Sequence, residues 1–376
     1  MLYKDFGTTS DKVSILGFGC MRLPMTQKDG ISVVDDEKNI PLLQKAVELG
    51  INFFDSHWFY CNFDSQRAVG KALSPVRKNV LISSKTYLRN FEKAEDFDMY
   101  LEKTLELMGL DYLDYYHLPA LSYQTWTQRV LPMKLLDRAE KAKSKGLIRH
   151  LSFSFHSDPD KMRELIDTEA FSSMLGQYNL ADRRNEEVFS YAKKKGVGTM
   201  VMGPLMGGVL TDGGNTFVKK MQSQASCAAE MALRFVWGLP AVDMILSGMS
   251  NLSQLEENIA FAKAAGDVTA QEWQALVDRS HELKELSDLY CTNCNYCAGC
   301  PKDIRIGRIF QLYIQHKNWG LSESVKKRIS PETFGNPRSG ENPSKCTACG
   351  ECTPKCPQGI DVPGELKRVW EELSSL

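Results

Sequence analysis

Short apolar runs alternate with amphipathic stretches throughout residues 1–265. The runs are rich in β-branched and aromatic residues, and each has the length of one strand. They occupy residues 13–20, 51–56, 79–86, 113–119, 148–155, 172–180, 197–205 and 242–248. The stretches between them carry apolar residues at helical spacing, as in "FDMYLEKTLELMGL". The pattern therefore predicts eight strands, each followed by a helix.

Glycine marks the expected ends of several of these helices. A left-handed C-terminal cap is expected at Gly50, Gly109, Gly146 and Gly196. Eight strand-helix units within about 250 residues are typical of a (β/α)8 TIM barrel. The alternative, a doubly wound open sheet, would be indicated by GxGxxG after the first strand, and the sequence has no such motif there. We therefore expect an α/β protein built on a parallel barrel.

Eight of the 11 cysteines form two groups near the end of the chain. The second group has the spacing of a bacterial [4Fe–4S] ferredoxin run and consists of Cys346, Cys349, Cys352 and Cys356. The first group is one residue shorter before its last cysteine and consists of Cys291, Cys294, Cys297 and Cys300. Zinc also binds paired C-x2-C motifs, but three such cysteines followed by Cys-Pro, twice in one chain, favour two [4Fe–4S] clusters.

The last cysteine of each group is displaced by a Cys-Pro turn, and in two-cluster proteins this cysteine binds the other cluster. We therefore expect one cluster on Cys291, Cys294, Cys297 and Cys356, and the other on Cys346, Cys349, Cys352 and Cys300. An amphipathic helix is expected at 304–320, between the two groups. The predicted organisation is a barrel at 1–265, a linking helix at 266–288 and a small, mainly helical ferredoxin-like domain at 289–376.

Composition and charge narrow the class of protein further. Apolar residues make up 43% of the chain and charged residues 25%, which is usual for a globular protein. The formal net charge of −1 gives no electrostatic case for binding nucleic acid or a membrane surface. The chain starts without a secretory signal pattern, and no stretch approaches the ~18 apolar residues of a membrane span. We expect a cytoplasmic protein whose cysteines are not disulfide-bonded, and the sequence does not define its oligomeric state.

Polar residues cluster where the predicted barrel strands end, which is where barrel enzymes carry their chemistry. They are Asp55, Tyr60, Lys85 and His117, on or just after strands two, three and four. A single Asp or Lys at a strand end is usually a solvated rim residue. Four such residues on neighbouring strands indicate a catalytic site.

Five segments of the barrel region resemble the aldo/keto reductase family: "LGFGCMRLP", "GINFFDSHWFY", "SSKT", "GQYN" and "LSGMSNLSQLEEN". Together with the cysteine groups, they resemble the branch of the family that carries a two-cluster ferredoxin-like domain. The resemblance implies hydride transfer from NADP or NAD to a small carbonyl compound, with Tyr60 as general acid. A free Tyr titrates near ~10, and a neighbouring Lys85 ammonium, held charged by Asp55, would lower that pKa. The alternative is that Tyr60 only packs at the barrel mouth beside Trp58 and Phe59.

The resemblance also implies a set of cofactor contacts: Ser154, Gln177, Leu205, Gly207, Ser247, Gly248, Gln254, Glu257 and Asn258. Glycine-rich "GPLMGG" and "SGMS" follow strands seven and eight, the usual phosphate site of a barrel, and suit a dinucleotide or an FMN phosphate equally. Met202 replaces an aromatic that often stacks on the nicotinamide. Gln254 replaces an Arg that often binds the NADPH 2′-phosphate, and it cannot make that charge-assisted contact.

The family's catalytic His aligns with Pro119, and His117 lies two residues earlier. At ~3.3 Å per residue, His117 would sit about 6–7 Å deeper in the barrel than the position of Pro119. It would reach the catalytic site only if the strand ends irregularly. His117 is therefore either a catalytic residue or a buried, hydrogen-bonded one. His57 and His156 also lie at strand ends and are alternative candidates.

Hydride transfer moves two electrons, whereas a [4Fe–4S] cluster passes one at a time. Two clusters therefore indicate a path to an external one-electron carrier such as ferredoxin, with a purely structural role as the alternative. The sequence favours an aldo/keto reductase-like oxidoreductase fused to this module. The alternatives are an electron-carrier or docking subunit with a degenerate barrel, and a flavin- or radical-type reductase fed by ferredoxin. Substrate identity is not encoded in a recognisable motif, because barrel specificity lies in loops such as 118–128.

Overall fold

The computed structural model describes residues 1–155, 159–212, 214–282, 289–291, 293–319, 322–335 and 339–376. The chain divides into two compact units. The first comprises 1–178, 184–202 and 236–269, and the second comprises 179–183, 203–235 and 270–376. The segment 203–235 thus groups with the C-terminal part of the chain, and the domain limits expected from the sequence stay a prediction. Among the helices of the described residues, none has the length and apolar character needed to cross a membrane.

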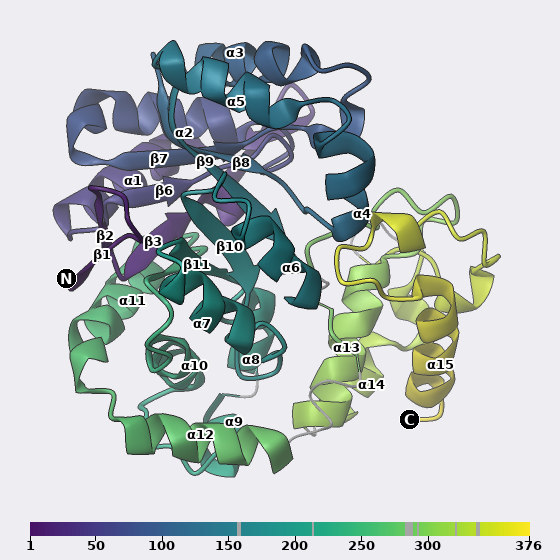
Figure 1. Ribbon diagram of the computed structural model, residues 1–376. Helices are drawn as coiled ribbons and strands as arrows, with labels where there is room; N and C mark the ends of the chain where they lie inside the picture. The colour runs from purple at the N-terminus through teal and green to yellow at the C-terminus, as the bar shows by residue number, and fades with distance from the viewer. Residues whose placement is uncertain (156–158, 213, 283–288, 292, 320–321, 336–338) are drawn as a thin grey trace. The chain divides into compact units, whose positions relative to one another are not determined.

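The first unit is a closed barrel of eight strands, all parallel to their neighbours (Figure 1). Its strands are β3 (Leu16–Gly19), β6 (Phe53–Asp55), β7 (Leu81–Lys85), β8 (Leu113–Leu118), β9 (Ile148–Phe155), β10 (Ser173–Gln177), β11 (Gly198–Met202) and β12 (Met244–Ser247). Each of the eight expected runs contains one of these strands. The predicted (β/α)8 barrel is therefore confirmed.

Helices follow the strands around the barrel, with α4 and a π-helical turn at Trp126–Val130 in the loop after β8. They are α1 (Asp36–Glu48), α2 (Ser65–Leu73), α3 (Asp96–Met108), α4 (Tyr123–Thr125), α5 (Leu135–Ser144), α6 (Pro159–Ile166), α7 (Glu186–Lys194) and α11 (Leu252–Ala264). α3 ends at Gly109, whose φ of 61° is the left-handed cap expected there. The other three expected cap glycines also have positive φ.

Two antiparallel hairpins precede the first barrel helix. The hairpin of β1 (Tyr3–Asp5) and β2 (Lys12–Ser14) places Phe6 and Val13 in one buried cluster with side chains of the barrel strands. The hairpin of β4 (Met25–Lys28) and β5 (Ile31–Val34) is tied to the loop after β6, because the Val34 amide donates to Asp64 Oδ2 at 2.8 Å. These contacts anchor the N-terminal segment to the barrel.

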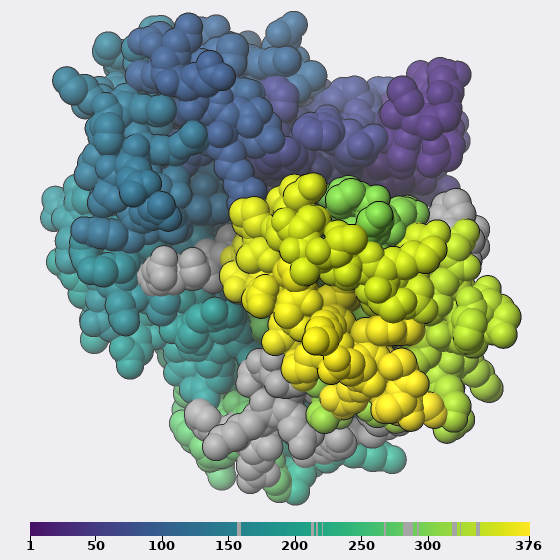
Figure 2. Space-filling view, turned by 90° about the vertical axis from the view of Figure 1, so that its right-hand side faces the viewer, coloured from purple at the N-terminus to yellow at the C-terminus, as the bar shows by residue number. Residues whose placement is uncertain are grey.

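The second unit is mainly helical, as expected. Its helices are α8 (Val209–Asp212), α9 (Gly214–Lys220), α12 (Ala270–Glu282), α13 (Ile306–Trp319), α14 (Ser322–Arg328) and α15 (Val362–Ser374), while α10 (Ala228–Trp237) has its last two residues in the first unit. α13 confirms the helix expected between the cysteine groups and packs against α8, α14 and α15. Its buried face includes Ile309, Phe310 and Leu312. In Figure 2 the C-terminal part of the chain, yellow-green to yellow, forms one continuous surface.

Candidate active site and cysteine clusters

Asp55, Lys85 and His117 stand on three consecutive barrel strands, β6, β7 and β8. Lys85 is the register partner of His117, and Asp55 is the partner of Ser83. The Lys85 ammonium forms a buried ion pair with both Asp55 carboxylate oxygens. It also donates to the Ser56 carbonyl at 3.3 Å. The structure therefore brings these three sequence-predicted residues together.

The Asp55–Lys85 pair is nearly excluded from water, with 2% and 3% of each residue exposed. Burial lowers the pKa of Lys85, and the Asp55 carboxylate opposes that effect by favouring the ammonium form. Ser83 Oγ donates a further hydrogen bond to Asp55 Oδ1 at 2.7 Å. Sequence reasoning missed Ser83, whose position two residues before Lys85 on the same strand face was the available signal. The carboxylate is thus held by two donors and keeps the ammonium in a fixed place.

His117 is fully buried, and its Nε2 lies 3.9 Å from Asp55 Oδ1. Neither ring nitrogen makes a hydrogen bond of ordinary geometry within the described residues. Burial and then the Lys85 charge lower the pKa of His117 well below its usual value, so the imidazole is neutral. Strand β8 ends at Leu118, and Ala120 has a positive φ of 48°, so the chain leaves the barrel irregularly just beyond this histidine.

Tyr60 lies in the turn after β6 and is half-buried. The Lys85 Nζ atom is 5.3 Å from the centre of its ring, and the His57 ring centre is also 5.3 Å away. Trp58, by contrast, packs edge-on against Tyr100 and donates its indole N–H to Thr104 Oγ1 at 3.0 Å. The structure thus places Tyr60 beside the buried cation.

His57 is the second histidine of this site. Its Nδ1 accepts a hydrogen bond from the Phe59 amide at 3.1 Å, so a neutral ring carries its proton on Nε2. Burial, followed by the Lys85 charge, lowers the pKa of His57 well below its usual value. His57 therefore presents a neutral N–H donor next to Tyr60. The other alternative from the sequence, His156, lies outside the described residues.

Three consecutive residues after Tyr60 adopt left-handed backbone conformations. Cys61, Asn62 and Phe63 have φ values of 53°, 54° and 68°. Asn tolerates this region, whereas for Cys and Phe it costs free energy of order 1–3 kcal/mol each. The Cys61 thiol points at the carbonyls of Cys20 and Met21, 3.6 and 3.5 Å away, and Asn62 donates to the Ser32 carbonyl at 3.0 Å. These contacts hold a strained turn that fixes where Tyr60 stands.

Several residues expected to contact a cofactor hold the first unit's own chain. The Ser154 hydroxyl accepts a hydrogen bond from the Ala120 amide at 3.0 Å, and Asn258 Nδ2 donates to Ser247 Oγ at 2.9 Å. Gln254 Oε1 accepts from the Ser250 amide at 2.8 Å, just before Asn251, whose side chain caps the start of α11. This amide oxygen is therefore committed to a structural contact.

The remaining expected cofactor residues fall in both units. The Glu257 carboxylate accepts from Ser253 Oγ at 3.2 Å, and the backbone carbonyl of Gln177, at the end of β10, accepts from Asn185 Nδ2 at 2.8 Å. Gly248 directly follows β12, in the first unit. Leu205 and Gly207 belong to a turn of the second unit, in which Gly207 has a φ of 68°.

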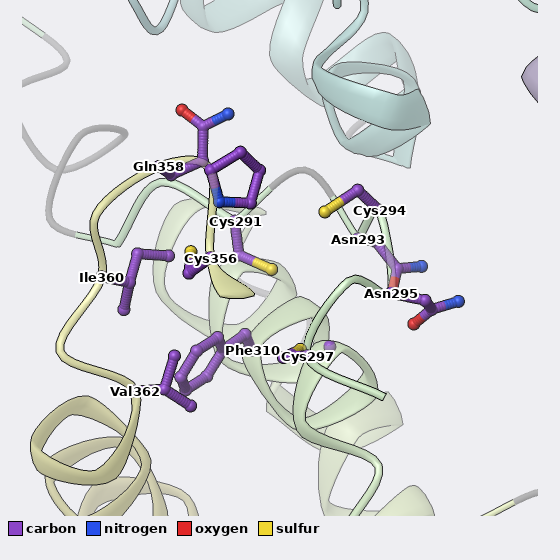
Figure 3. Close-up of a pocket in the computed structure, with 12 residues that line it drawn as sticks. Cys291, Asn293, Cys294, Asn295, Cys297, Phe310, Cys356, Gln358, Ile360 and Val362 are labelled. Atoms are coloured by element: carbon purple, nitrogen blue, oxygen red, sulfur yellow. The ribbon is translucent and has the colours of Figure 1, made fainter. Parts of the chain in front are cut away.

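Four cysteines from two distant segments surround one pocket of the second unit. Figure 3 shows Cys291, Cys294, Cys297 and Cys356 around this pocket, together with apolar side chains such as Phe310 of α13. Burial and the neighbouring thiols raise the pKa of Cys291 to about 12 and that of Cys297 to about 11. Iron binding must therefore displace protons from these thiols as the cluster assembles. The set is the one expected for the first cluster.

The cysteines of the second set are near enough to affect one another electrostatically. Burial is the main cause that raises the pKa of Cys352, and the thiols of Cys349, Cys346 and Cys300 raise it further. In the described part of the chain no three Cys, His, Asp or Glu side chains converge closely enough for a single metal ion. A tetrahedral zinc ion with Zn–S bonds of about 2.3 Å needs thiolate sulfurs about 3.8 Å apart. A four-iron cluster is larger and holds its cysteine sulfurs farther apart. The exchange of fourth ligands between the two clusters stays a prediction.

Replacement of Cys300 by Ser should alter the cluster held by Cys346, Cys349 and Cys352. Wild-type protein prepared without oxygen should contain about eight iron and eight sulfide per chain. EPR spectra of the reduced variant should show a changed signal from the second cluster and an unchanged one from the first. The matched variant Cys356→Ser should show the reverse. A change confined to the first cluster in Cys300→Ser would contradict the exchange.

Comparison with known proteins places this geometry in a family. The aldo/keto reductase family profile matches residues 15–278, and a 4Fe-4S dicluster domain matches residues 290–361. The chain therefore belongs to the aldo/keto reductase family, and it carries a C-terminal iron–sulfur domain. It is an oxidoreductase, as the sequence predicted. The dicluster match also confirms iron–sulfur over zinc.

Individual relatives support this assignment. The uncharacterized oxidoreductase YqkF of Bacillus subtilis is 25% identical over 318 residues, which cover 76% of this chain and 98% of that protein. L-galactose dehydrogenase of Arabidopsis thaliana is 26% identical over 288 residues, covering 68% and 86%. Among solved structures, the holo form of aldo-keto reductase AKR11C1 from Bacillus halodurans superposes with a TM-score of 0.63 at 25% identity, covering 74% and 96%.

Proposed function

We propose that the protein transfers hydride between a nicotinamide cofactor, NADP or NAD, and the carbonyl group of a small molecule, with Tyr60 as the general acid. The observation that carries the proposal is the buried Asp55–Lys85 pair, whose ammonium lies 5.3 Å from the centre of the Tyr60 ring. A fixed cation beside a phenol favours release of its proton. Burying two charges away from water costs free energy. A barrel that had lost its catalytic role would have no need to keep such a buried pair.

The nicotinamide supplies the hydride when it is bound, and the residues of this chain supply the proton and the positioning. Tyr60 donates its hydroxyl proton to the carbonyl oxygen, and the Lys85 ammonium stabilises the phenolate that remains. Asp55 keeps Lys85 charged and directed at this point. The neutral His57 can donate its Nε2 proton as a hydrogen bond to the same oxygen, which orients the carbonyl. His117, level with Lys85 on the next strand, contributes an uncharged neighbour that does not compete for the Asp55 carboxylate.

The two clusters are proposed to pass electrons to or from an external one-electron carrier such as ferredoxin. One cluster would be enough to cross-link a small domain, whereas two in sequence form a path. The convergence of two four-cysteine sets in the second unit supports this role. The comparisons give no support to a flavin, so the ferredoxin-fed flavin reductase is the weaker alternative.

Nicotinamide binding and turnover test the proposal. Anaerobic protein should quench or shift the fluorescence of NADPH or NADH saturably, and it should oxidise the bound nucleotide when a panel of aldehydes and ketones is added. Because Gln254 is neutral and its amide oxygen accepts from the Ser250 amide, no charge at this position should favour NADPH over NADH. Asp55→Asn should bind the nucleotide but turn over slowly, since the ammonium loses its anionic partner. Failure of the wild type to bind either nucleotide would sink the proposal and favour an electron-carrier subunit.

A further inference from the structure

A second cavity lies in the second unit, beside the first cysteine group. It has a volume of about 590 Å³, which is within the ~300–1,000 Å³ of small-molecule sites. One wall is the turn at Gly207–Gly208 with the start of α8, and the facing wall is the loop 293–300 with the first turns of α13. Cys297 and Cys300 are both part of the lining. A molecule in this cleft would therefore adjoin one proposed ligand of each cluster.

Three arginines line the cleft: Arg305, Arg308 and Arg328. Arg308 donates from Nη2 to the Arg328 carbonyl at 2.7 Å, and Arg328 donates from Nη1 to Gln315 Oε1 at 2.7 Å. Both guanidinium groups are thus held in place by neutral acceptors. Asp303 is the acidic residue of the lining, and it lies 3.7 Å from Arg305. The lining therefore carries an excess of positive charge.

Arg308 has an unused hydrogen-bonding group. Its Nη1 atom is buried and has no hydrogen-bond partner within the described residues. A buried guanidinium nitrogen without an acceptor is costly, and the cost is greatest when the group is charged. Burial and the charge of Arg328 lower the pKa of Arg308. An anion in the cleft would balance the charge of the two cations.

The opposite wall suits a close approach by such an anion. Gly208 has a φ of 99°, and a Cβ atom built on it would meet nothing within 4 Å. The backbone at this turn is therefore open toward empty space. Arginine forks bind phosphate through paired charge-assisted hydrogen bonds, and two or three of them match a dianion better than a single carboxylate.

We propose that this cleft binds the phosphate group of a small molecule, a nucleotide or a simpler phosphate ester, through Arg308 and Arg328. The inference goes beyond hydride transfer at Tyr60, because Arg308 and Arg328 belong to the iron–sulfur domain, while the turn at Gly207 is shared with the expected cofactor contacts. It is independent of turnover, since binding is measured on the resting protein.

Isothermal titration calorimetry of the anaerobic holoprotein with inorganic pyrophosphate tests the proposal. Wild-type protein should bind it saturably, and Arg308→Gln or Arg328→Gln should weaken binding ~10–100-fold, the usual effect of losing a charge-assisted hydrogen bond. Lys327→Gln is the matched control, because Lys327 is an exposed cation on the same helix outside the lining, and it should bind like wild type. Arg328 is itself exposed, so its variant remains informative if Arg308→Gln does not fold.

Further titrations identify the source of the phosphate. Adenosine 5′-monophosphate binding more tightly than ribose 5-phosphate would identify a nucleotide, and equal affinity would identify a simpler ester. No saturable binding of any of the three probes, or equal binding by wild type and both arginine variants, would overturn the proposal. So would a change in cluster reduction potential in Arg308→Gln without any change in phosphate affinity, because the arginines would then serve only to balance cluster charge.

Discussion

Replacing Tyr60 with Phe should reduce turnover by ~10²–10⁴-fold, the range expected when a general acid is lost. The substitution removes one hydroxyl and leaves the ring beside His57 and Lys85. The turn that carries the ring keeps its backbone contacts, so folding should be unchanged. Steady-state oxidation of NADPH or NADH with a carbonyl substrate measures the effect. The loss should appear in kcat, while nucleotide binding followed by fluorescence should stay close to wild type.

The matched control is Tyr100→Phe, the same chemical change on α3, where the Tyr100 ring stacks on Phe91. This variant should keep wild-type activity, and both variants should keep their iron and sulfide. Unaltered turnover in Tyr60→Phe would show that another group delivers the proton. His57, whose Nε2 carries a proton beside the same ring, would then be the next residue to replace.

A reduced one-electron donor should drive turnover of the intact protein, and the effect should disappear when Cys346 and Cys349 are both replaced by Ser. Ferredoxin or a viologen dye can serve as the donor, and reduction of the nicotinamide or of the substrate is followed anaerobically. The physical reason is electron counting: two electrons passed singly by the clusters, together with one proton, equal one hydride. The prediction therefore includes a centre at the barrel mouth that collects both electrons, such as the nicotinamide or a substrate that tolerates a radical. Loss of the second cluster breaks the path, so the donor-dependent rate should fall to background.

The double variant should still reduce carbonyl compounds with NADPH or NADH, because Asp55, Tyr60 and Lys85 belong to the other compact unit. Cys227→Ser controls for the loss of a thiol, since Cys227 belongs to neither cysteine group. If the intact protein ignores the donor while the cluster-deficient variant keeps full nucleotide-dependent activity, the clusters are structural.

The barrel and the Asp55–Lys85–His117 cluster could be predicted from the sequence, because both follow from local patterns. Strand-like runs recur at regular intervals, and parallel strands of a barrel bring their ends to one rim. The depth of His117 could not be predicted, since it depends on where β8 ends and on the turn at Ala120. The contact of Ser154 with the Ala120 amide also requires knowledge of that turn.

The cysteine spacing predicted the four cysteines that line one pocket, because the rule for the fourth cysteine is local. The arginine cleft could not be foreseen in the same way. Its walls come from the turn after β11 and from the start of α13, about a hundred residues apart in sequence. No periodicity or motif joins these segments. Gln254 shows the opposite case, where the side chain of a residue expected to contact a cofactor binds the Ser250 amide at the start of α11.

At the left-handed turn of Cys61, Asn62 and Phe63, substitutions that raise thermal stability are expected to lower the turnover rate. Glycine at Cys61 or Phe63 would remove the steric cost of the backbone, so a screen for stable variants would be drawn to these positions. The same side chains brace the turn through the carbonyls of Cys20 and Met21 and through the Phe59 ring, whose centre lies 5.5 Å from that of Phe63. A glycine at either position would remove these contacts, and the Tyr60 phenol would no longer be held beside the Lys85 ammonium. Engineering for robustness should therefore leave this turn intact and look for gains elsewhere in the barrel.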